Sequence, residues 1–181
     1  MGMQTIVSRQ LNLSREPAVI SIGAIHGGNR ENIIPESVEL LGTVRTFDDG
    51  MRDDTLKRMQ VTAESIAEAS GAKAEIKFLK PAYATTVNDV SLTERMAPTL
   101  RQVTGGQAVM APKLSASEDF SAYQKQVPGL IFFLGSTDPK QDPKTAAPNH
   151  SPNIKIDEAA LAVGARSMVA LALDYLNSAN P

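Results

Sequence analysis

The stretch that decides the fold is residues 26–47, His-Gly-Gly-Asn-Arg-Glu-Asn-Ile-Ile-Pro-Glu-Ser-Val-Glu-Leu-Leu-Gly-Thr-Val-Arg-Thr-Phe. Its first half predicts a turn, because the glycine pair permits positive φ and Pro35 has no N–H to donate to a β-ladder. Residues 37–46 predict a strand, because apolar and β-branched side chains recur along them. The whole stretch therefore predicts a strand that is entered through a glycine-rich turn.

Two polar side chains of this stretch are candidates for binding an anion. In a strand, Val44 belongs to the main apolar row and Arg45 points to the opposite face. Asn32 lies in the turn, thirteen residues before Arg45. A turn amide and a strand guanidinium can converge on one carboxylate, the amide donating one hydrogen bond and the guanidinium two. The alternative is a solvated strand charge and an ordinary turn residue.

The order of motifs resembles a known family. The pattern Gly-Gly-x-x-x-Asn-Ile-Ile-Pro-Glu, followed by Gly-Thr-Val-Arg-Thr-Phe, resembles the lid (dimerisation) domain of the M20 family of metallopeptidases and amidohydrolases. The most similar branch includes hippurate hydrolases, N-acyl-amino-acid amidohydrolases and auxin-conjugate hydrolases. The resemblance implies metal-dependent cleavage of the amide bond of N-acyl amino acids. It also implies that Asn32 and Arg45 bind the carboxylate of the substrate.

The composition is that of a globular, weakly charged protein. Of 181 residues, 42% are hydrophobic and 21% charged, and the formal net charge is −2, which provides no strong field for nucleic acid or a membrane surface. No apolar run of bilayer-spanning length and no secretion signal are expected, so a cytoplasmic location is predicted. The absence of cysteine excludes disulfides and thiolate metal ligands.

The first part of the chain predicts the order helix, strand, strand, helix, strand. The expected elements cover residues 4–13, 18–25, 37–46, 52–70 and 73–80. This order is a ferredoxin-like unit without its first strand, and with the second part of the chain it predicts an α+β fold. We expect a partial lid domain at residues 1–82.

The resemblance places the absent strand in the middle of the lid sheet. The strand expected at 73–80 would then lack its natural neighbour, which should destabilise the lid or expose an edge for pairing with another chain. The resemblance also implies a homodimer in which two lid sheets join through an edge strand, here residues 18–25.

The second part, residues 83–181, predicts an α/β segment that resembles the end of the M20 catalytic domain. Residues 81–86 read as a linker. Helices are expected at 91–103, with an interruption or kink at Pro98, at 119–126 and after Asp157, and strands at 107–110 and 130–134.

His150 lies in the loop sequence Pro-Asn-His-Ser-Pro. A lone loop histidine is usually a surface residue. The resemblance implies instead that His150 is a ligand of the catalytic metal, zinc or manganese. The chain departs from the family at Asn153 and Ile154, where an aromatic residue is more common. The other histidine, His26, is interpreted as a turn residue.

Residues 115–121 resemble the Ser-Glu-Asp-Phe-Ser signature that lines the family's substrate pocket. Ser117 and Glu118 are therefore candidate substrate-binding residues, since hydroxyls and backbone N–H groups at such a turn can receive an acyl oxygen or a carboxylate. The alternative is that these residues only start a helix.

Metal-assisted amide hydrolysis needs several metal ligands and a carboxylate that carries the proton. The resemblance places most of these in a half of the catalytic domain that this sequence lacks. We therefore expect no catalytic residue within the chain and no activity of the isolated chain. The alternative hypothesis is a non-catalytic dimerisation or ligand-binding module from a truncated or split gene.

Overall fold

In the computed structural model, which describes residues 1–79 and 83–178, the stretch 26–47 forms the turn and second strand of a β-hairpin. Strand β1 (Ala18–His26) pairs antiparallel with β2 (Glu39–Thr46), from Ala18 opposite Thr46 to His26 opposite Glu39. The register shifts between Ile22 and Ala24, which marks a β-bulge. Both predicted strands are confirmed.

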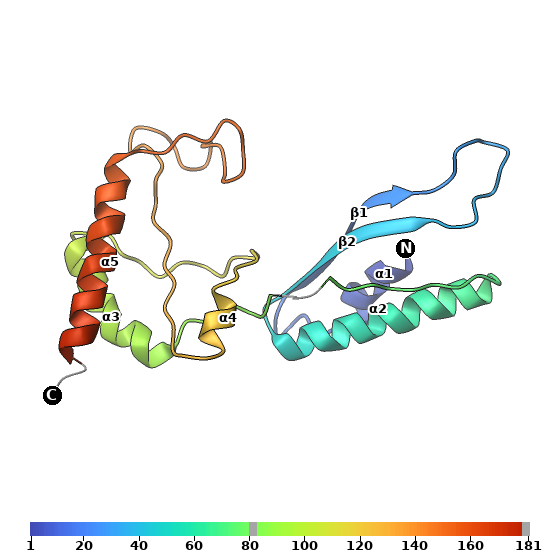
Figure 1. Ribbon diagram of the computed structural model, residues 1–181, viewed down its shortest axis with the longest axis horizontal. Helices are drawn as coiled ribbons and strands as arrows, with labels where there is room; N and C mark the ends of the chain where they lie inside the picture. The colour runs from blue at the N-terminus through green and yellow to red at the C-terminus, as the bar shows by residue number, and fades with distance from the viewer. Residues whose placement is uncertain (80–82, 179–181) are drawn as a thin grey trace. The chain divides into compact units, whose positions relative to one another are not determined.

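The hairpin packs on helices to form a small core. Helix α2 (Asp49–Ala69) lies along the hairpin, with α1 (Gly2–Thr5) and the short π-helix η1 (Ile6–Gln10) beside it (Figure 1). Ile6, Ile20 and Met59 are buried together, one from each layer, and Val44 packs against them. Each such side chain contributes about 1.5–3 kcal/mol when fully buried. Val44 therefore faces the core, and the neighbouring Arg45 is exposed, as the alternation predicts.

Helix α2 begins three residues before the predicted start because Asp48 caps it. The Asp48 carboxylate accepts a hydrogen bond from the Met51 N–H at 2.7 Å, a type of contact that contributes about 1 kcal/mol. The predicted end is confirmed, since Gly71 follows the helix with φ +70°.

The strand predicted at 73–80 is not formed in residues 73–79, and Lys80 lies outside the described residues. The segment runs back along α2 (Figure 1), where Ala74 and Ile76 are half-buried between exposed neighbours and Ile76 packs against the core. The period-two pattern is therefore present. A β-ladder also needs a neighbouring strand, and among the described residues the sheet contains only β1 and β2.

The chain divides into two compact units. The first comprises Met1–Thr86 and Lys113–Ala122, and the second comprises Val87–Pro112 and Tyr123–Pro181. The domain boundary predicted between residues 82 and 83 lies at the edge of the described ranges, so it stays a prediction. Residues 81 and 82 of the predicted linker lie outside those ranges.

Two predicted helices of the second unit are confirmed and pack on each other. They are α3 (Val90–Val103), which continues through Pro98, and α5 (Ala159–Ser178). Thr99 donates to the Asp174 carboxylate between them. Arg95 donates to the Tyr175 carbonyl at 2.9 Å and lies 4.9 Å from the centre of its ring. The helix predicted at 119–126 is shorter, α4 (Ser121–Gln124).

No apolar run of bilayer-spanning length is expected from the sequence, and helix α5 differs from that expectation. By length and composition alone it could cross a membrane, and it is the one such helix in the described part of the chain. Arg166 and Asp174 interrupt its apolar sequence, and α3 covers part of its surface. A helix that packs on protein meets the same criteria.

The strands predicted at 107–110 and 130–134 are wrong, since neither segment has regular secondary structure. For the segment 130–134, a physical reason is visible at Ile131. Its N–H donates to the Asn88 side chain at 2.9 Å, and its carbonyl accepts from the same amide at 2.8 Å. A side chain thus satisfies the backbone groups that a neighbouring strand would otherwise pair. The α+β class is confirmed with one two-stranded sheet in the described residues.

The cap of α3 predicts a pH dependence. The Ser91 hydroxyl, and then the Leu92 N–H, hydrogen-bond to the Asp89 carboxylate and lower its pKa below the ordinary 3.8. A pKa that is lower in the folded state stabilises the fold above the unfolded-state value, and this stabilisation is lost as pH falls through the folded-state value. Asp89→Asn should keep the cap and flatten the fall in stability below pH 3.8, measured by urea unfolding against pH. An unchanged acid dependence in Asp89→Asn would contradict this assignment.

Candidate functional site

Arg45 projects from β2 and contacts a segment far away in sequence. It lies opposite Val19 in the hairpin, and its Nη1 donates to the carbonyl of Ser115 at 2.6 Å. The two residues are 70 positions apart, and both belong to the first unit. The guanidinium therefore joins the hairpin to the segment that carries Ser117.

Three further contacts attach this segment to the same unit. Lys113 Nζ lies 2.5 Å from the Glu16 carboxylate and 5.9 Å from the centre of the Phe47 ring. The Thr86 hydroxyl donates to the Glu118 carbonyl at 3.5 Å. Residues 113–118 are thus held at several points.

A small pocket of about 110 Å³ opens where the segment meets β2 and the start of α2. It is lined mainly by cationic and hydroxyl side chains, among them Arg45, Arg52, Thr85, Thr86, Ser115 and Ser117. Such groups donate hydrogen bonds to oxygen atoms of anions. This anion pocket is the candidate site.

The two arginines of the anion pocket differ in their partners. Arg52 lies 3.3 Å from the Asp49 carboxylate and 3.0 Å from that of Asp53. Asp49 also accepts hydrogen bonds from the N–H and hydroxyl of Thr85, at 2.9 and 3.0 Å. Within the described residues, Arg45 has no carboxylate within ion-pair distance. Arg45 is therefore the cation that remains for a ligand.

Sequence reasoning missed Arg52 and Thr85. Their available signal was the helix start, since Asp49 and Arg52 lie on the first turn after the Asp48 cap. The sequence around Thr85 gives no such indication, because Thr85 lies 36 residues after Asp49 and contacts it only in the folded chain.

Ser117 and Glu118, predicted together, have different surroundings. Ser117 is exposed and lines the anion pocket. Glu118 is half-buried, and its carboxylate accepts the Phe120 N–H at 3.2 Å before α4. This hydrogen bond supports the alternative that Glu118 only starts a helix. A contact between Glu118 and a substrate stays a prediction.

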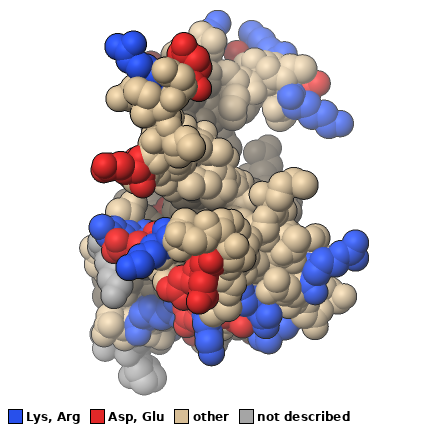
Figure 2. Space-filling view, turned by 90° about the vertical axis from the view of Figure 1, so that its right-hand side faces the viewer, with Lys and Arg blue, Asp and Glu red and all other residues tan. Residues whose placement is uncertain are grey.

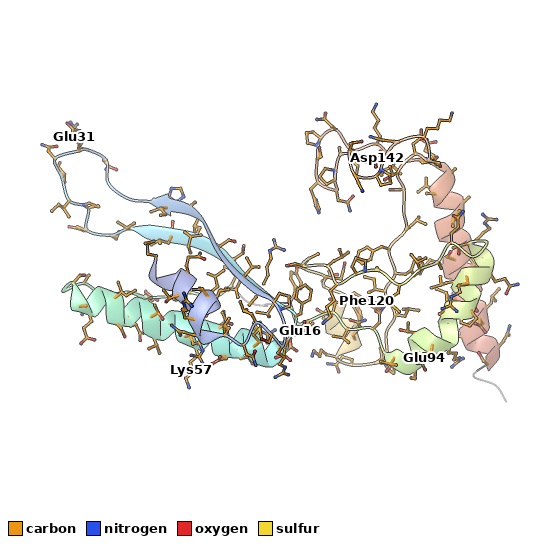
Figure 3. The ribbon with its side chains drawn as sticks, turned by 180° about the vertical axis from the view of Figure 1, so that it is seen from behind. Glu16, Glu31, Lys57, Glu94, Phe120 and Asp142 are labelled. Carbon is orange, nitrogen blue, oxygen red and sulfur yellow. The ribbon has the colours of Figure 1, made fainter. Side chains whose placement is uncertain are left out.

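Asn32 and Arg45 do not converge within one copy of the chain. Asn32 lies in the loop beyond the His26–Glu39 pair, whereas Arg45 lies near the other end of β2. Figure 3 labels Glu31 at the loop tip and Glu16 near the opposite end of β1. The six residue-to-residue steps of β2 from Glu39 to Arg45 alone span roughly 20 Å. Within one copy of the chain the hairpin therefore separates the two side chains, and their shared contact with one carboxylate stays a prediction.

His150 lies in an exposed turn of the second unit, after the Pro148 carbonyl that accepts the Ser151 N–H at 3.1 Å. Its φ is +68°, and no other non-glycine residue in the described ranges has a positive φ. This conformation is unfavourable for an L-residue, and such strain occurs often at functional sites. His26 is exposed at the end of β1.

The described residues do not form a complete metal centre. Among them, no three His, Asp or Glu side chains lie close enough to hold one ion. The exposed imidazole of His150 has the chemistry of a single ligand. The chain's described donors therefore fit one coordination position and not a whole site.

Charged side chains are mixed in sign on the face shown in Figure 2, where blue and red residues are interspersed. This distribution agrees with the small net charge of −2. The local charge of the anion pocket is therefore set by its own arginines and aspartates.

Comparison with known proteins identifies relatives along nearly the whole chain. The sequence profile of peptidase family M20/M25/M40 matches residues 4–174. Thermostable carboxypeptidase 1 of Saccharolobus solfataricus is 34% identical over 95% of this chain and 42% of its own length. N-acetylcysteine deacetylase of Bacillus subtilis is 32% identical over 98% of this chain and 44% of its own.

A solved structure agrees with this match. The crystal structure of a Bacillus subtilis protein described as a dinuclear metal binding peptidase from the M20 family has a TM-score of 0.75 and 31% identity. The alignment covers 97% of this chain and 46% of that one. The chain thus spans less than half the length of these relatives.

The backbone at His150 gives a test of strain. Glycine adopts positive φ without a steric penalty, so His150→Gly should be more stable than His150→Ala by roughly 1 kcal/mol. Unfolding in urea measures the difference. At Asn149, whose φ is not positive, the order should reverse, because glycine there only adds freedom to the unfolded chain. Equal stability of the two His150 variants would argue against strain at this position.

Proposed function

Since this chain belongs to peptidase family M20/M25/M40, whose members are hydrolases, we propose that it functions in the metal-dependent hydrolysis of N-acyl amino acids such as hippurate. The observation that carries the proposal is Arg45, which lies in a hydroxyl-lined pocket without a carboxylate partner among the described residues. An N-acyl amino acid presents one carboxylate, which is the group that a guanidinium binds best.

The donors of the anion pocket suit one carboxylate. A guanidinium has five N–H donors, and the Ser115 carbonyl accepts from Nη1. The remaining donors can form two hydrogen bonds with a carboxylate, and the Ser117 hydroxyl can donate a third hydrogen bond. The Asp49–Arg52–Thr85 contacts close the wall beside it. We assign Arg45 and Ser117 to substrate binding, and Glu118 to the turn that carries Ser117.

Asn32 can join this site from a second copy of the chain. In a homodimer formed through the free edge of β1, two antiparallel strands pair about a twofold axis. The loop that follows His26 in one copy then lies beside Ala18 and Val19 of the other, the end at which Arg45 sits. Adjacent strands are roughly 4.8 Å apart, so Asn32 of the second copy would approach Arg45 across β1.

Exposed apolar side chains on the hairpin favour such a dimer. Ile25, Leu40 and Leu41 are 66%, 55% and 50% exposed, and all lie on the loop side of the bulge, where the helices give little cover. A cluster of this kind is typical of an interaction surface. In this proposal the hairpin, α2 and residues 73–79 form part of a ferredoxin-like lid whose remaining strand comes from outside the described residues.

His150 would supply one ligand of a divalent ion, zinc or manganese, which would polarise the amide carbonyl and acidify water. The other ligands and the proton-carrying carboxylate would come from outside this chain. We propose a cytoplasmic location, and no role for nucleic acid or a membrane, on the basis of the charge and composition.

The second candidate function is a non-catalytic module that binds acidic small molecules. One observation favours it. The anion pocket is built wholly from residues of the first unit, whereas His150 belongs to the second. A ligand carboxylate could therefore bind without any metal centre.

Binding tests the shared part of both hypotheses. The chain should bind hippurate, and Arg45→Met should weaken binding roughly tenfold or more, since hydrogen bonds to a charged group are lost. Isothermal titration calorimetry measures the dissociation constant. Arg58→Met is the matched control, because Arg58 pairs with Asp54 on α2 and does not line the pocket. Equal weakening in both variants, or none in Arg45→Met, would refute the assignment.

Turnover separates the two hypotheses. The isolated chain should hydrolyse neither hippurate nor N-acetyl amino acids with added zinc, manganese or cobalt, since the described residues offer one candidate ligand. The assay is release of the free amino acid. Turnover that depends on metal and disappears in His150→Ala would show that the chain is an enzyme by itself.

A further inference from the structure

Residues 113–117 form a strap across the anion pocket, attached at alternate positions. Lys113 contacts Glu16 and Phe47, the carbonyl of Ser115 accepts from Arg45, and Ser117 lines the pocket. The two attachments before Ser117 use side chains from the ends of β1 and β2. The strap therefore has a fixed point at one end and the ligand-facing hydroxyl at the other.

The fixed point is the Lys113–Glu16 ion pair. Its N···O distance is 2.5 Å, and the Glu16 side chain is only 22% exposed, while that of Lys113 is 66% exposed. A partly buried carboxylate gains more from a cation than one in open solvent does. Lys113 also lies 5.9 Å from the Phe47 ring centre, within the range of a cation–π contact.

The two partners of Lys113 lie just outside the strands β1 and β2. Glu16 precedes β1 by two residues, and Phe47 follows Arg45 by two residues. Lys113 in turn precedes Ser115 by two residues. Lys113 thus lies two residues before the carbonyl that accepts from Arg45, and its own partners lie beside the two strands of the hairpin.

We propose that Lys113 is a positioning residue for the anion pocket, which holds the strap so that Arg45 and Ser117 face the same ligand carboxylate; the ligand in this statement rests on the proposed function. Without the ion pair, the Ser115 carbonyl loses its fixed position and Arg45 loses an acceptor that orients it. Lys113 itself does not line the pocket.

The free chain gives the first test. The side-chain ¹⁵N–¹H signals of Arg45, assigned by their loss in Arg45→Met, report its hydrogen bond to Ser115. In Lys113→Met these signals should shift toward those of a solvated arginine, as expected for the loss of the ion pair that holds the strap. Lys113→Arg should preserve the signals. Signals unchanged in Lys113→Met would overturn the proposal.

A charge exchange separates positioning from general stability. Glu16→Gln should reproduce the Lys113→Met signals, and the double variant Lys113→Glu/Glu16→Lys should restore them, because the ion pair is re-formed in reverse. Lys140→Met is the matched control, since Lys140 is exposed in the second unit. If Lys113→Met does not fold, Glu16→Gln carries the test, and failure of the double variant to restore the signals would contradict positioning by this pair.

Hippurate gives the second test. Lys113→Met should weaken hippurate binding about fivefold, and the double variant should return it to near the wild-type value. If wild-type chain binds hippurate and Lys113→Met binds it equally well, the positioning role is refuted and the proposed function stands. If wild-type chain does not bind hippurate, the proposed function fails, and the Arg45 signals still decide whether Lys113 positions the strap.

Discussion

The site depends on one hydrogen bond, from Arg45 Nη1 to the carbonyl of Ser115. It joins a strand to a segment 70 residues later and so closes the anion pocket on one side. A backbone carbonyl is a neutral acceptor, so the bond orients the guanidinium and leaves its charge uncompensated. The neighbouring Arg52 shows the contrast, because two aspartates neutralise it.

A second constraint is the small size of the sheet. With two strands in the described residues, the hairpin has one face on α2, and its far end stays open. Ile20 and Val44 pack against the core near the Arg45 end, whereas Ile25 and Leu40 are exposed beyond the bulge. The end that carries the anion pocket is thus the end that packs against the core. The open end carries Asn32 and is suited to contact another chain.

Elements with local signals could be predicted from the sequence. The hairpin, the end of α2 at Gly71 and the exposed face of Arg45 follow from turn residues and periodicity, which act over a few positions. The strands expected at 107–110 and 130–134 failed, because a strand needs a neighbour that no local pattern reveals. At Ile131 the Asn88 side chain takes that place. The Ser115 acceptor, Thr85 and the Lys113–Glu16 pair could not be predicted for the same reason, and the separation of Asn32 from Arg45 required the register of the hairpin.

We propose that Arg45 of this chain receives a ligand carboxylate beside Ser117. A crystal structure of the chain with bound hippurate tests it most directly. The carboxylate should lie within hydrogen-bond distance of the Arg45 guanidinium and the Ser117 hydroxyl, with the Ser115 carbonyl still bound to Arg45. Hippurate bound elsewhere, with Arg45 turned out to solvent, would contradict it.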